Sequence, residues 1–377
     1  MTTFVRPGMR AVPCMLMRGG TSRGPFFLAS DLPIEIQARD LVLLAAMGSP
    51  DRRQIDGLGG ANVLTSKVGI VSKSRAAGVA LDFLFAQLRP DDDTVDTTAN
   101  CGNMLAAVVP FAIEAGLVAA CEGSTTVRVR TINTDMQCDI TVQTPDKCLQ
   151  YLGDARIDGV PGSAAPIKIN FLDTAGSICP SMLPSGAVRN TMVVEAAGLA
   201  PFTIDATLID NGMPMVLVHA AQLDVTGYET VDELNGNTVL KQKLEALRLQ
   251  AGPLMGLGDV AKKNYPKMCL VAPPRSGGSI ATRCFIPHVC HEAIGVLAAV
   301  TIGTACVLEG SVAHAVATVP PGEAKTISVE HPTGEFSVEL GLDPQDPQNV
   351  TRAALLRTAR LIMRGEVIIP ESAWKGQ

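Results

Sequence analysis

Two long apolar runs stand out along the chain, and both have the same layout. Each begins with a cysteine and two small or polar residues, then stays almost wholly apolar for the length of a helix, over residues 101–118 and 290–308. A helix that is apolar on every side must be enclosed by other structure. The pattern predicts two buried helices, one starting at Cys101 and the other at Cys290.

Strand-like segments surround both runs. They are rich in Val, Ile, Thr and Phe and are bounded by turn-forming residues, as strands are. They cover residues 68–74, 79–88, 126–133, 138–144 and 165–172 in the first half, and 191–198, 205–212, 214–220, 267–273 and 279–287 in the second. Residues 326–340 predict a hairpin that turns at 332–334. In residues 233–251, an amphipathic surface helix is predicted by Leu240, Leu244, Leu247 and Leu249.

The repeated layout predicts an α+β fold of two similar lobes, each with strands wrapped around one buried helix. A length of 377 residues also suggests about two domains. We place the junction within residues 181–190, so that an N-terminal lobe covers residues 1–186 and a C-terminal lobe covers residues 187–377. The last residues are free to pack back on the N-terminal lobe.

Composition narrows the class of partner. Hydrophobic residues make up 47% and charged residues 18% of the chain, which is enough apolar material for a sizeable core. The net charge of −6 and the scarcity of aromatic residues, at 4%, argue against a nucleic-acid-binding protein. An acidic protein can still hold a local positive pocket, so a small anionic ligand stays open.

The cysteines and the apolar segments indicate where in the cell the protein is located. The ten cysteines are scattered without a C-x-x-C pair, which fits reduced thiols in the cytoplasm. The first residues do not resemble a signal peptide, and the apolar stretch 293–308 contains glycine and is shorter than a membrane span. We therefore expect a cytoplasmic protein with no membrane partner.

Cys101 is the first candidate for chemistry. A cysteine in the first turn of a helix faces unsatisfied backbone N–H groups and the positive end of the helix dipole, which favours the thiolate. The same N–H groups can hold a carboxylate. The alternative is that Cys101 simply caps a buried helix, since free cysteine is commonly a small buried hydrophobe.

Lys67 is the second candidate, because it follows a glycine-containing loop, residues 57–62, and enters an apolar strand. Burial lowers the pKa of a lysine and lets the amine act as a general base. The alternative is an edge-strand lysine with its ammonium in water. The spacing differs from that of a nucleotide-binding G-x-x-x-x-G-K-[ST] loop.

Two further motifs are less specific. Residues 18–24, RGGTSRG, combine glycines, hydroxyls and guanidinium groups that suit a carboxylate or phosphate, or they form a plain turn between two strands. His288, Cys290 and His291 do not predict a metal site, because zinc needs three or four convergent ligands and no complementary cluster is visible. We also expect no serine-hydrolase chemistry.

Several segments resemble one known family and together span nearly the whole chain. They are MRGGTSRGPFF (17–27), residues 47–72, NCGNMLA (100–106), IDNGMPMVL (209–217), NYPKMCLVAPP (264–274) and FIPHVCHEAIGV (285–296). The chain resembles the diaminopimelate epimerase-like superfamily, in the branch of 4-oxalomesaconate tautomerase/isomerase and 2-methylaconitate isomerase. The resemblance implies two pseudo-symmetric lobes, each a mostly antiparallel β-barrel around a central buried helix.

The resemblance also implies roles for the candidate residues. Lys67 becomes the main proton-transfer base and Cys101 its catalytic partner. Cys290 is followed by His291 and Glu292 rather than by the Gly-rich run of the epimerases, so it either keeps proton chemistry or only lines the pocket. The expected substrate-binding residues are Ser22, Thr65, Ser66, Asn100, Gly102, Asn103, Met104, Lys267, Arg275, Arg283, His288 and Cys290.

The activity implied is that of a cofactor-independent isomerase, with no metal, acting on 4-oxalomesaconate in aromatic-acid degradation. The reaction is either a keto–enol tautomerisation or a 1,3-allylic isomerisation, in a pocket between the lobes that closure would seal from water. The partner is then a small polycarboxylate, and related folds often form homodimers. Three alternatives stay open: a 2-methylaconitate cis–trans isomerase, another small-acid epimerase, and a non-catalytic small-acid-binding protein.

Overall fold

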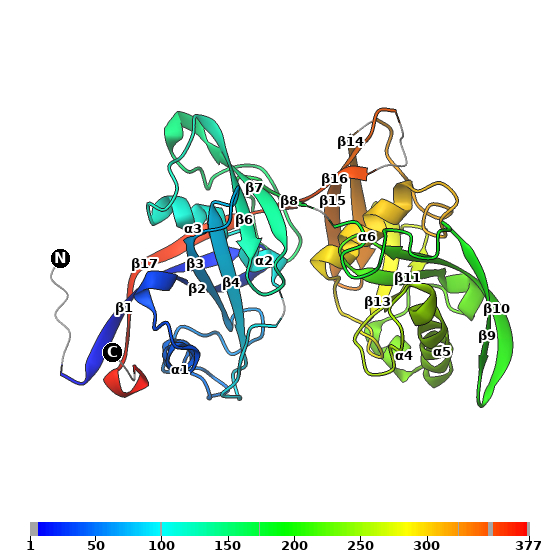
Figure 1. The fold of residues 1–377 in the computed structure, drawn as a ribbon, viewed down its shortest axis with the longest axis horizontal. Coiled ribbons are helices and arrows are strands. Elements are labelled where there is room, and N and C mark those ends of the chain that lie inside the picture. The colour runs from blue at the N-terminus through cyan, green and yellow to red at the C-terminus, as the bar shows by residue number, and fades with distance from the viewer. Residues whose placement is uncertain (1–6, 99, 173, 323, 346–349, 375–377) are drawn as a thin grey trace. The chain divides into compact units, whose positions relative to one another are not determined.

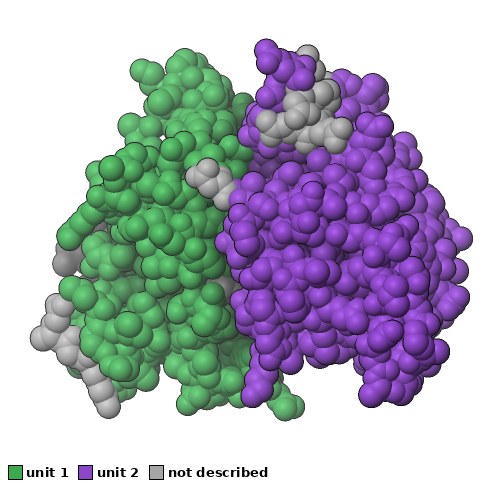
Figure 2. Space-filling view, turned by 45° about the vertical axis from the view of Figure 1, so that its right-hand side comes forward, with its two compact units in different colours: residues 1–172, 356–377 green, residues 173–355 purple. Residues whose placement is uncertain are grey.

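The computed structural model describes residues 7–98, 100–172, 174–322, 324–345 and 350–374. The chain divides into two compact units, shown in Figures 1 and 2: unit 1 comprises residues 1–172 and 356–377, and unit 2 comprises residues 173–355. The division falls earlier than the junction expected at residues 181–190. The reason is that Asp210 of unit 2 accepts hydrogen bonds from the segment 177–179.

Unit 1 consists of strands around two short helices. Its strands are β1 (Met9–Gly19), β2 (Ser22–Leu28), β3 (Lys67–Lys73), β4 (Leu81–Leu88), β5 (Val95–Asp96), β6 (Gly123–Thr131), β7 (Gln137–Thr144), β8 (Ile167–Phe171) and β17 (Ala359–Pro370). Its α-helices are α1 (Ile36–Met47), α2 (Gly102–Leu105) and α3 (Val108–Glu114). Because α2 and α3 contact β1, β2, β3, β7 and β17, the strands enclose these helices.

Unit 2 consists of strands around one longer helix. Its strands are β9 (Asn190–Ala196), β10 (Leu199–Asp210), β11 (Pro214–His219), β12 (Lys267–Ala272), β13 (Ile280–Phe285), β14 (Ala324–His331), β15 (Gly334–Leu342) and β16 (Val350–Arg357). Its α-helices are α4 (Val231–Gly236), α5 (Thr238–Leu254) and α6 (Val296–Val307). The enclosed helix is α6, which contacts β10, β11, β14 and β15.

The two units use the same order of strand pairing. Among the described strands, unit 1 pairs in the order β17, β1, β2, β3, β4, β6, β7, β8, and unit 2 in the order β9 through β16. In both units the third and fifth pairings are parallel and the other pairings are antiparallel. Two similar, mostly antiparallel lobes, each around a helix, are therefore confirmed, as are the strand segments and the 326–340 hairpin.

The enclosed helix of unit 1 is interrupted, which the sequence pattern did not predict. The run 101–118 forms α2 and α3 with a break at residues 106–107, where the backbone bonds run from residue i to i−3. Pro110 explains the break, because it has no N–H to donate to Ala106 and its ring collides with a carbonyl four residues earlier in a continuous helix.

The enclosed helix of unit 2 starts later than expected. α6 begins at Val296 with Gly295 as its N-cap, so the expectation that it starts at Cys290 is wrong. Instead, Cys290 forms an isolated bridge with Phe285. Gly295 explains the delay, because a residue of weak helix propensity suits a cap better than a helix interior.

The amphipathic helix predicted over residues 233–251 is present as α4 and α5. Leu240, Leu244 and Leu247 are buried as expected, whereas Leu249 is 39% exposed. A residue two positions after Leu247 is turned about 200° around the helix, so it cannot share the buried face.

Candidate active site

The turn between β1 and β2 packs directly against the start of α2. A Cβ atom on Gly19 would collide with the backbone oxygen of Asn103, and one on Gly20 would collide with the Asn103 side chain. Across this contact, Asn103 Nδ2 donates a hydrogen bond to Thr21 Oγ1 at 2.9 Å. Glycine at both positions therefore lets the hairpin and α2 approach closely.

Lys67 is the first residue of β3, and only 8% of it is exposed. Its Nζ donates to Gln87 Oε1 at 2.5 Å and lies 5.0 Å from the centre of the Phe85 ring. Gln87 is fixed in turn, because its Nε2 donates to the backbone oxygens of residues 63, 66 and 88. The amine of Lys67 is therefore buried, as expected, and held between a polar acceptor and an aromatic face.

Cys101 is the N-cap of α2, and it is half-buried. Its thiol makes no capping hydrogen bond. The neighbouring Asn100 donates from Nδ2 to the hydroxyls of Thr131 and Thr134. The expected position of Cys101 at a helix start is confirmed, although the helix that begins at Gly102 is only one turn long.

Gly24 links the lysine to the helix. A Cβ atom on Gly24 would collide with the backbone oxygen of Lys67 and would lie 3.3 Å from Met104 Cε. β2, the start of β3 and α2 therefore meet at Gly24. This contact brings Lys67 next to the segment that also carries Cys101.

Three buried polar atoms around this meeting point have no hydrogen-bond partner within the described part of the chain. They are Ser22 Oγ, Asn100 Oδ1 and Asn103 Oδ1. A buried polar atom without a partner is costly and needs an explanation. A bound polar molecule that donates and accepts hydrogen bonds would satisfy all three, so this cluster is the candidate active site.

Thr65 and Ser66 lie at the edge of this cluster and are used by their own loop. Ser66 Oγ donates to Gln54 Oε1 and lies 2.8 Å from the backbone oxygen of Asn62, and Thr65 Oγ1 bonds to the same oxygen at 3.2 Å. Ser66 is fully buried. These hydroxyls hold the loop before Lys67 in place, and their role in binding substrate stays a prediction.

Residues 20–24 have the spacing G-x-S-x-G of a hydrolase nucleophile elbow. A nucleophile elbow is a turn from a strand into a helix. Here the motif spans the turn of the β1–β2 hairpin, and Ser22 pairs with Gly19 in the antiparallel register. The surroundings of Ser22 therefore do not match those of a serine hydrolase.

In unit 2, Lys267 and His291 form a second basic group. Burial lowers the pKa of Lys267, against an opposing effect of Cys284. Burial also lowers the pKa of His291, and the charge of Lys267 contributes to that decrease. The backbone N–H of Ala293 donates to His291 Nδ1 at 2.8 Å, so this nitrogen is an acceptor. Both side chains are therefore biased toward their neutral forms.

The other basic candidates of unit 2 are engaged with protein groups. The Arg275 guanidinium stacks 3.9 Å from the ring centre of Tyr228. Arg283 donates to the backbone oxygens of residues 229 and 282. His288 is half-exposed and pairs with Glu245 at 3.5 Å. The structure does not bring these three together with Lys267, and their binding roles stay predictions.

Cys290 is buried in the hydrophobic core of unit 2, with 2% exposed. Burial raises the pKa of its thiol to about 11, with Cys284 adding to the increase. Its backbone N–H donates to Asn235 Oδ1 at 2.8 Å. These surroundings favour the neutral thiol and a packing role.

Sequence reasoning missed Gln87, which positions Lys67, and Thr21, which positions Asn103. Gln87 ends an alternating strand segment and gave no chemical signal of its own. Its position opposite Lys67 depends on the β3–β4 register. Thr21 belonged to the glycine-containing motif, but only its contact with Asn103 shows its function.

Neither a cluster of metal-binding side chains nor a membrane-spanning helix occurs among the described residues. Within the described residue ranges, no group of three or more His, Cys, Asp or Glu side chains is arranged to hold a metal ion. Of the helices in those ranges, none combines the length and apolar character needed to cross a membrane.

Comparison with known proteins defines the class. Residues 9–370 match the family model described as PrpF protein, and the chain belongs to this family. It is 54% identical to the (4E)-oxalomesaconate Delta-isomerase of Novosphingobium sp. strain KA1, over 96% of this chain and 98% of the relative. It is 50% identical to the 4-oxalomesaconate tautomerase of Pseudomonas putida strain KT2440, over 98% and 99% of the two chains.

Solved structures agree with this assignment. The crystal structure of a methylitaconate-delta-isomerase superposes with a TM-score of 0.86 at 34% identity, covering 98% of both chains. A hydroxyproline epimerase from Agrobacterium vitis has a TM-score of 0.50 at 13% identity, covering 97% of this chain and 94% of that one, and shows the fold alone. The expected epimerase-like α+β fold is confirmed, and the chain is an isomerase.

Proposed function

We propose that this isomerase acts on 4-oxalomesaconate and moves a proton and a double bond without a cofactor. The cluster of unpartnered polar atoms around Lys67 and Cys101 carries the proposal, because it offers proton-transfer groups beside donors and acceptors for a polar acid. The 54% and 50% identities to proteins named for oxalomesaconate favour this substrate over methylitaconate, whose isomerase is 34% identical.

The substrate supplies its own electron sink. A carbon next to a carbonyl group that is conjugated with a double bond loses a proton to give a dienolate, whose charge spreads over the conjugated system. Returning the proton to oxygen gives the enol, and returning it to another carbon gives the double-bond isomer. The protein then has to place a base at the carbon and stabilise the enolate oxygen.

Lys67 is the proposed base, acting as the neutral amine. Its Nζ is positioned by Gln87, and its place in the interior shields it from competing water. Cys101 is the proposed partner that returns the proton, because its thiol is accessible and is not used for capping. Ser22 Oγ would donate to a carboxylate or to the enolate oxygen. Asn100 Oδ1 and Asn103 Oδ1 would accept from a hydroxyl of the substrate, such as that of the enol, because their amide nitrogens already donate to threonine hydroxyls.

The substrate is tested by incubating the protein with 4-oxalomesaconate in deuterated water and following ultraviolet absorbance and proton NMR. We expect turnover with solvent deuterium entering a carbon of the product if the reaction is an allylic shift. A pure keto–enol tautomerisation would place solvent deuterium on the enol oxygen. Turnover of 2-methylaconitate but not 4-oxalomesaconate would contradict the proposal, and binding without exchange in either acid would indicate a non-catalytic protein.

The proposed biological setting is the breakdown of aromatic acids in the cytoplasm, since ring cleavage can supply an unsaturated keto acid. A homodimer is the proposed assembly. Sedimentation velocity of the purified protein tests this, because a monomer sediments as a single 39.5 kDa species. The substrate assay is independent of that result.

A further inference from the structure

Three arginines lie side by side across neighbouring strands of unit 1. In the antiparallel register, Arg18 of β1 is directly opposite Arg23 of β2 on one side and Arg360 of β17 on the other. Directly opposite residues project from the same face of a sheet, with Cβ atoms about 4.5–5.5 Å apart. The charge of Arg360 acts on Arg18, whereas the Arg23 guanidinium reaches the loop before β3, where a Cβ atom on Gly60 would lie 2.8 Å from Arg23 Nη2. Because guanidinium groups stay protonated, the like charges of Arg18 and Arg360 destabilise the sheet on their own.

No carboxylate forms an ion pair with this row in the part of the chain that the structure describes. None of the three arginines takes part in an ion pair there. Arg18 Nη1 instead donates to neutral acceptors, the backbone oxygens of Gly20 and Thr358 and the hydroxyl of Thr358, at 2.9–3.0 Å. Arg23 Nε is buried without a partner. Burial and the charge of Arg360 both lower the pKa of Arg18.

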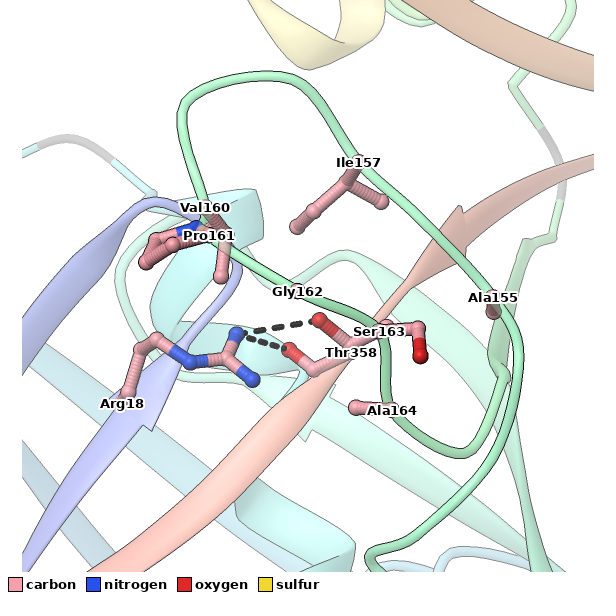
Figure 3. Close-up of a pocket in the computed structure, with 9 residues that line it drawn as sticks. All are labelled: Arg18, Ala155, Ile157, Val160, Pro161, Gly162, Ser163, Ala164 and Thr358. Carbon is pink, nitrogen blue, oxygen red and sulfur yellow. Dashed lines mark hydrogen bonds between the residues drawn. The ribbon is translucent and has the colours of Figure 1, made fainter.

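Arg18 also lines a pocket, shown in Figure 3. The opposite wall is the loop 155–164, whose ends are joined by two hydrogen bonds of 3.0 Å between Ala155 and Ala164. Figure 3 shows the Arg18 guanidinium directed at Thr358 beside Ser163 and Ala164. The enclosed space is about 20 Å³, enough for a group about the size of one water molecule. The pocket therefore admits one oxygen atom of a small oxyanion whose remainder lies outside.

This pocket lies on the opposite face of the hairpin from the candidate active site. Side chains alternate between the faces of a strand, and Gly24 and Ser22 face the side of Lys67 and α2. Arg23, between them in sequence, faces the other way. Thr21 connects the two sides, because it accepts a hydrogen bond from Asn103 and a Cβ atom on Gly159 would lie 3.0 Å from its methyl group.

We propose that Arg18, with Arg360 beside it, binds a small oxyanion, a carboxylate or a phosphate, at a site separate from the candidate active site. The anion neutralises the row and satisfies guanidinium N–H groups that lack an acidic partner. Its binding steadies the β1–β2 turn and, through Thr21, the start of α2.

The test measures anion binding by calorimetry and by thermal melting, with tricarballylate and inorganic phosphate as separate probes at matched ionic strength. We expect Arg18→Gln to weaken binding of the preferred anion about tenfold. Arg360→Gln should weaken it several-fold and raise the melting temperature without anion, because a like-charge contact is removed. Arg75→Gln, at an exposed turn of the same unit, is the matched control and should bind as the parent does.

Lys67→Met distinguishes this site from the candidate active site, because binding at the arginine row should persist in that variant. Binding within twofold of the parent in both Arg18→Gln and Arg360→Gln would overturn the proposal, as would binding that is lost only in Lys67→Met. If Arg18→Gln fails to fold, Arg360→Gln decides alone, since this exposed side chain makes no hydrogen bond or ion pair within the described residues. None of these measurements needs turnover, so they do not depend on the proposed reaction.

Discussion

Lys67 and Lys267 occupy the same place in the two units. Each is the first residue of the fourth strand in the shared pairing order, β3 in unit 1 and β12 in unit 2. Their surroundings differ, because Lys67 Nζ has Gln87 and the Phe85 ring, whereas Lys267 Nζ makes no hydrogen bond within the described residues. The same strand arrangement therefore places two lysines in different surroundings. Lys67, whose Nζ has a hydrogen-bond acceptor, is the one that lies next to the unpartnered polar cluster.

The two cysteines show the same contrast. Cys101 directly caps α2 and is half-buried, while Cys290 precedes α6 by several residues and lies in the core. Proton transfer needs an accessible group whose pKa suits the working pH. Matching positions in a repeated fold therefore do not imply matching chemistry.

The largest expected difference between the units is in how much turnover falls when each of the two lysines is replaced. Lys67→Met should lower turnover about 10³-fold, because general-base catalysis contributes about 10²–10⁴-fold. Lys267→Met should act mainly on KM, by about tenfold, through the loss of one hydrogen bond to the substrate. Steady-state kinetics on 4-oxalomesaconate measures both. Lys73→Met, at an exposed lysine on β3, is the control and should keep the turnover of the parent. Equal losses of kcat in Lys67→Met and Lys267→Met would contradict the view that the two lysines differ in chemistry.

The cysteines should separate activity from stability. Cys101→Ser should lower turnover about 10²-fold with an almost unchanged free energy of unfolding. Cys290→Ser should cost about 1–2 kcal/mol of stability, because it buries a hydroxyl in an apolar core. Urea unfolding and kinetics on the two variants check this. A Cys290→Ser protein that is fully stable and has lost its turnover would show that both thiols do chemistry.

Gln87 should act on the reaction through Lys67, as a positioning residue. Gln87→Glu places a carboxylate beside the amine, which raises the pKa of the lysine. The acid limb of the pH profile of kcat/KM should then move to higher pH, with roughly tenfold less activity at neutral pH for a shift of about one unit. Gln150→Glu, at an exposed glutamine of unit 1, should leave the profile unchanged. A uniform loss of activity at every pH would indicate a merely structural role.

The smallest expected effect is the pH dependence of stability caused by His291. Its pKa in the folded protein lies below 6.5, so the unfolded chain binds more protons in the window just below pH 6.5. The free energy of unfolding therefore falls as the pH decreases through that window, with a slope of at most about 1.4 kcal/mol per pH unit for one group. His291→Gln should flatten this slope. Urea unfolding at pH 5.0 to 7.5 measures it, and an unchanged slope would mean that His291 titrates normally.

Much of the fold was readable from the sequence because its strands and helices have clear apolar patterns. The strands around residues 68–88 and 267–287 were found in this way, and so was the enclosure of the helical run 296–307. The start of the first helix after Cys101 was predicted, but the break before Pro110 and the delayed start after Gly295 were not, because the apolar pattern continues unchanged through both positions. The boundary at residue 172 also escaped, since it depends on contacts of Asp210 with residues distant in sequence.

Only some residues of the candidate site could be predicted from the sequence. Lys67 and Cys101 were found through residue type, their places beside strand and helix starts, and the family resemblance. The motif 18–24 indicated guanidinium groups suited to an anion, but Gln87 and the alignment of Arg18 with Arg360 were not found, because both are defined by which residues face each other across a sheet. Strand register depends on the whole fold, so a single sequence carries little direct signal of it.

The C-terminal strand β17 belongs to unit 1, so unit 1 is completed after unit 2 during synthesis. Unit 2 is one continuous segment, whereas β1 obtains its partner only when β17 has been made. A ribosome that synthesises the chain from its N-terminus thus releases the complete second unit while the first still has an unpaired edge. An unpaired edge strand can pair with other chains. Until residues 359–370 emerge, the nascent unit 1 is therefore the part most exposed to aggregation and most dependent on chaperone protection.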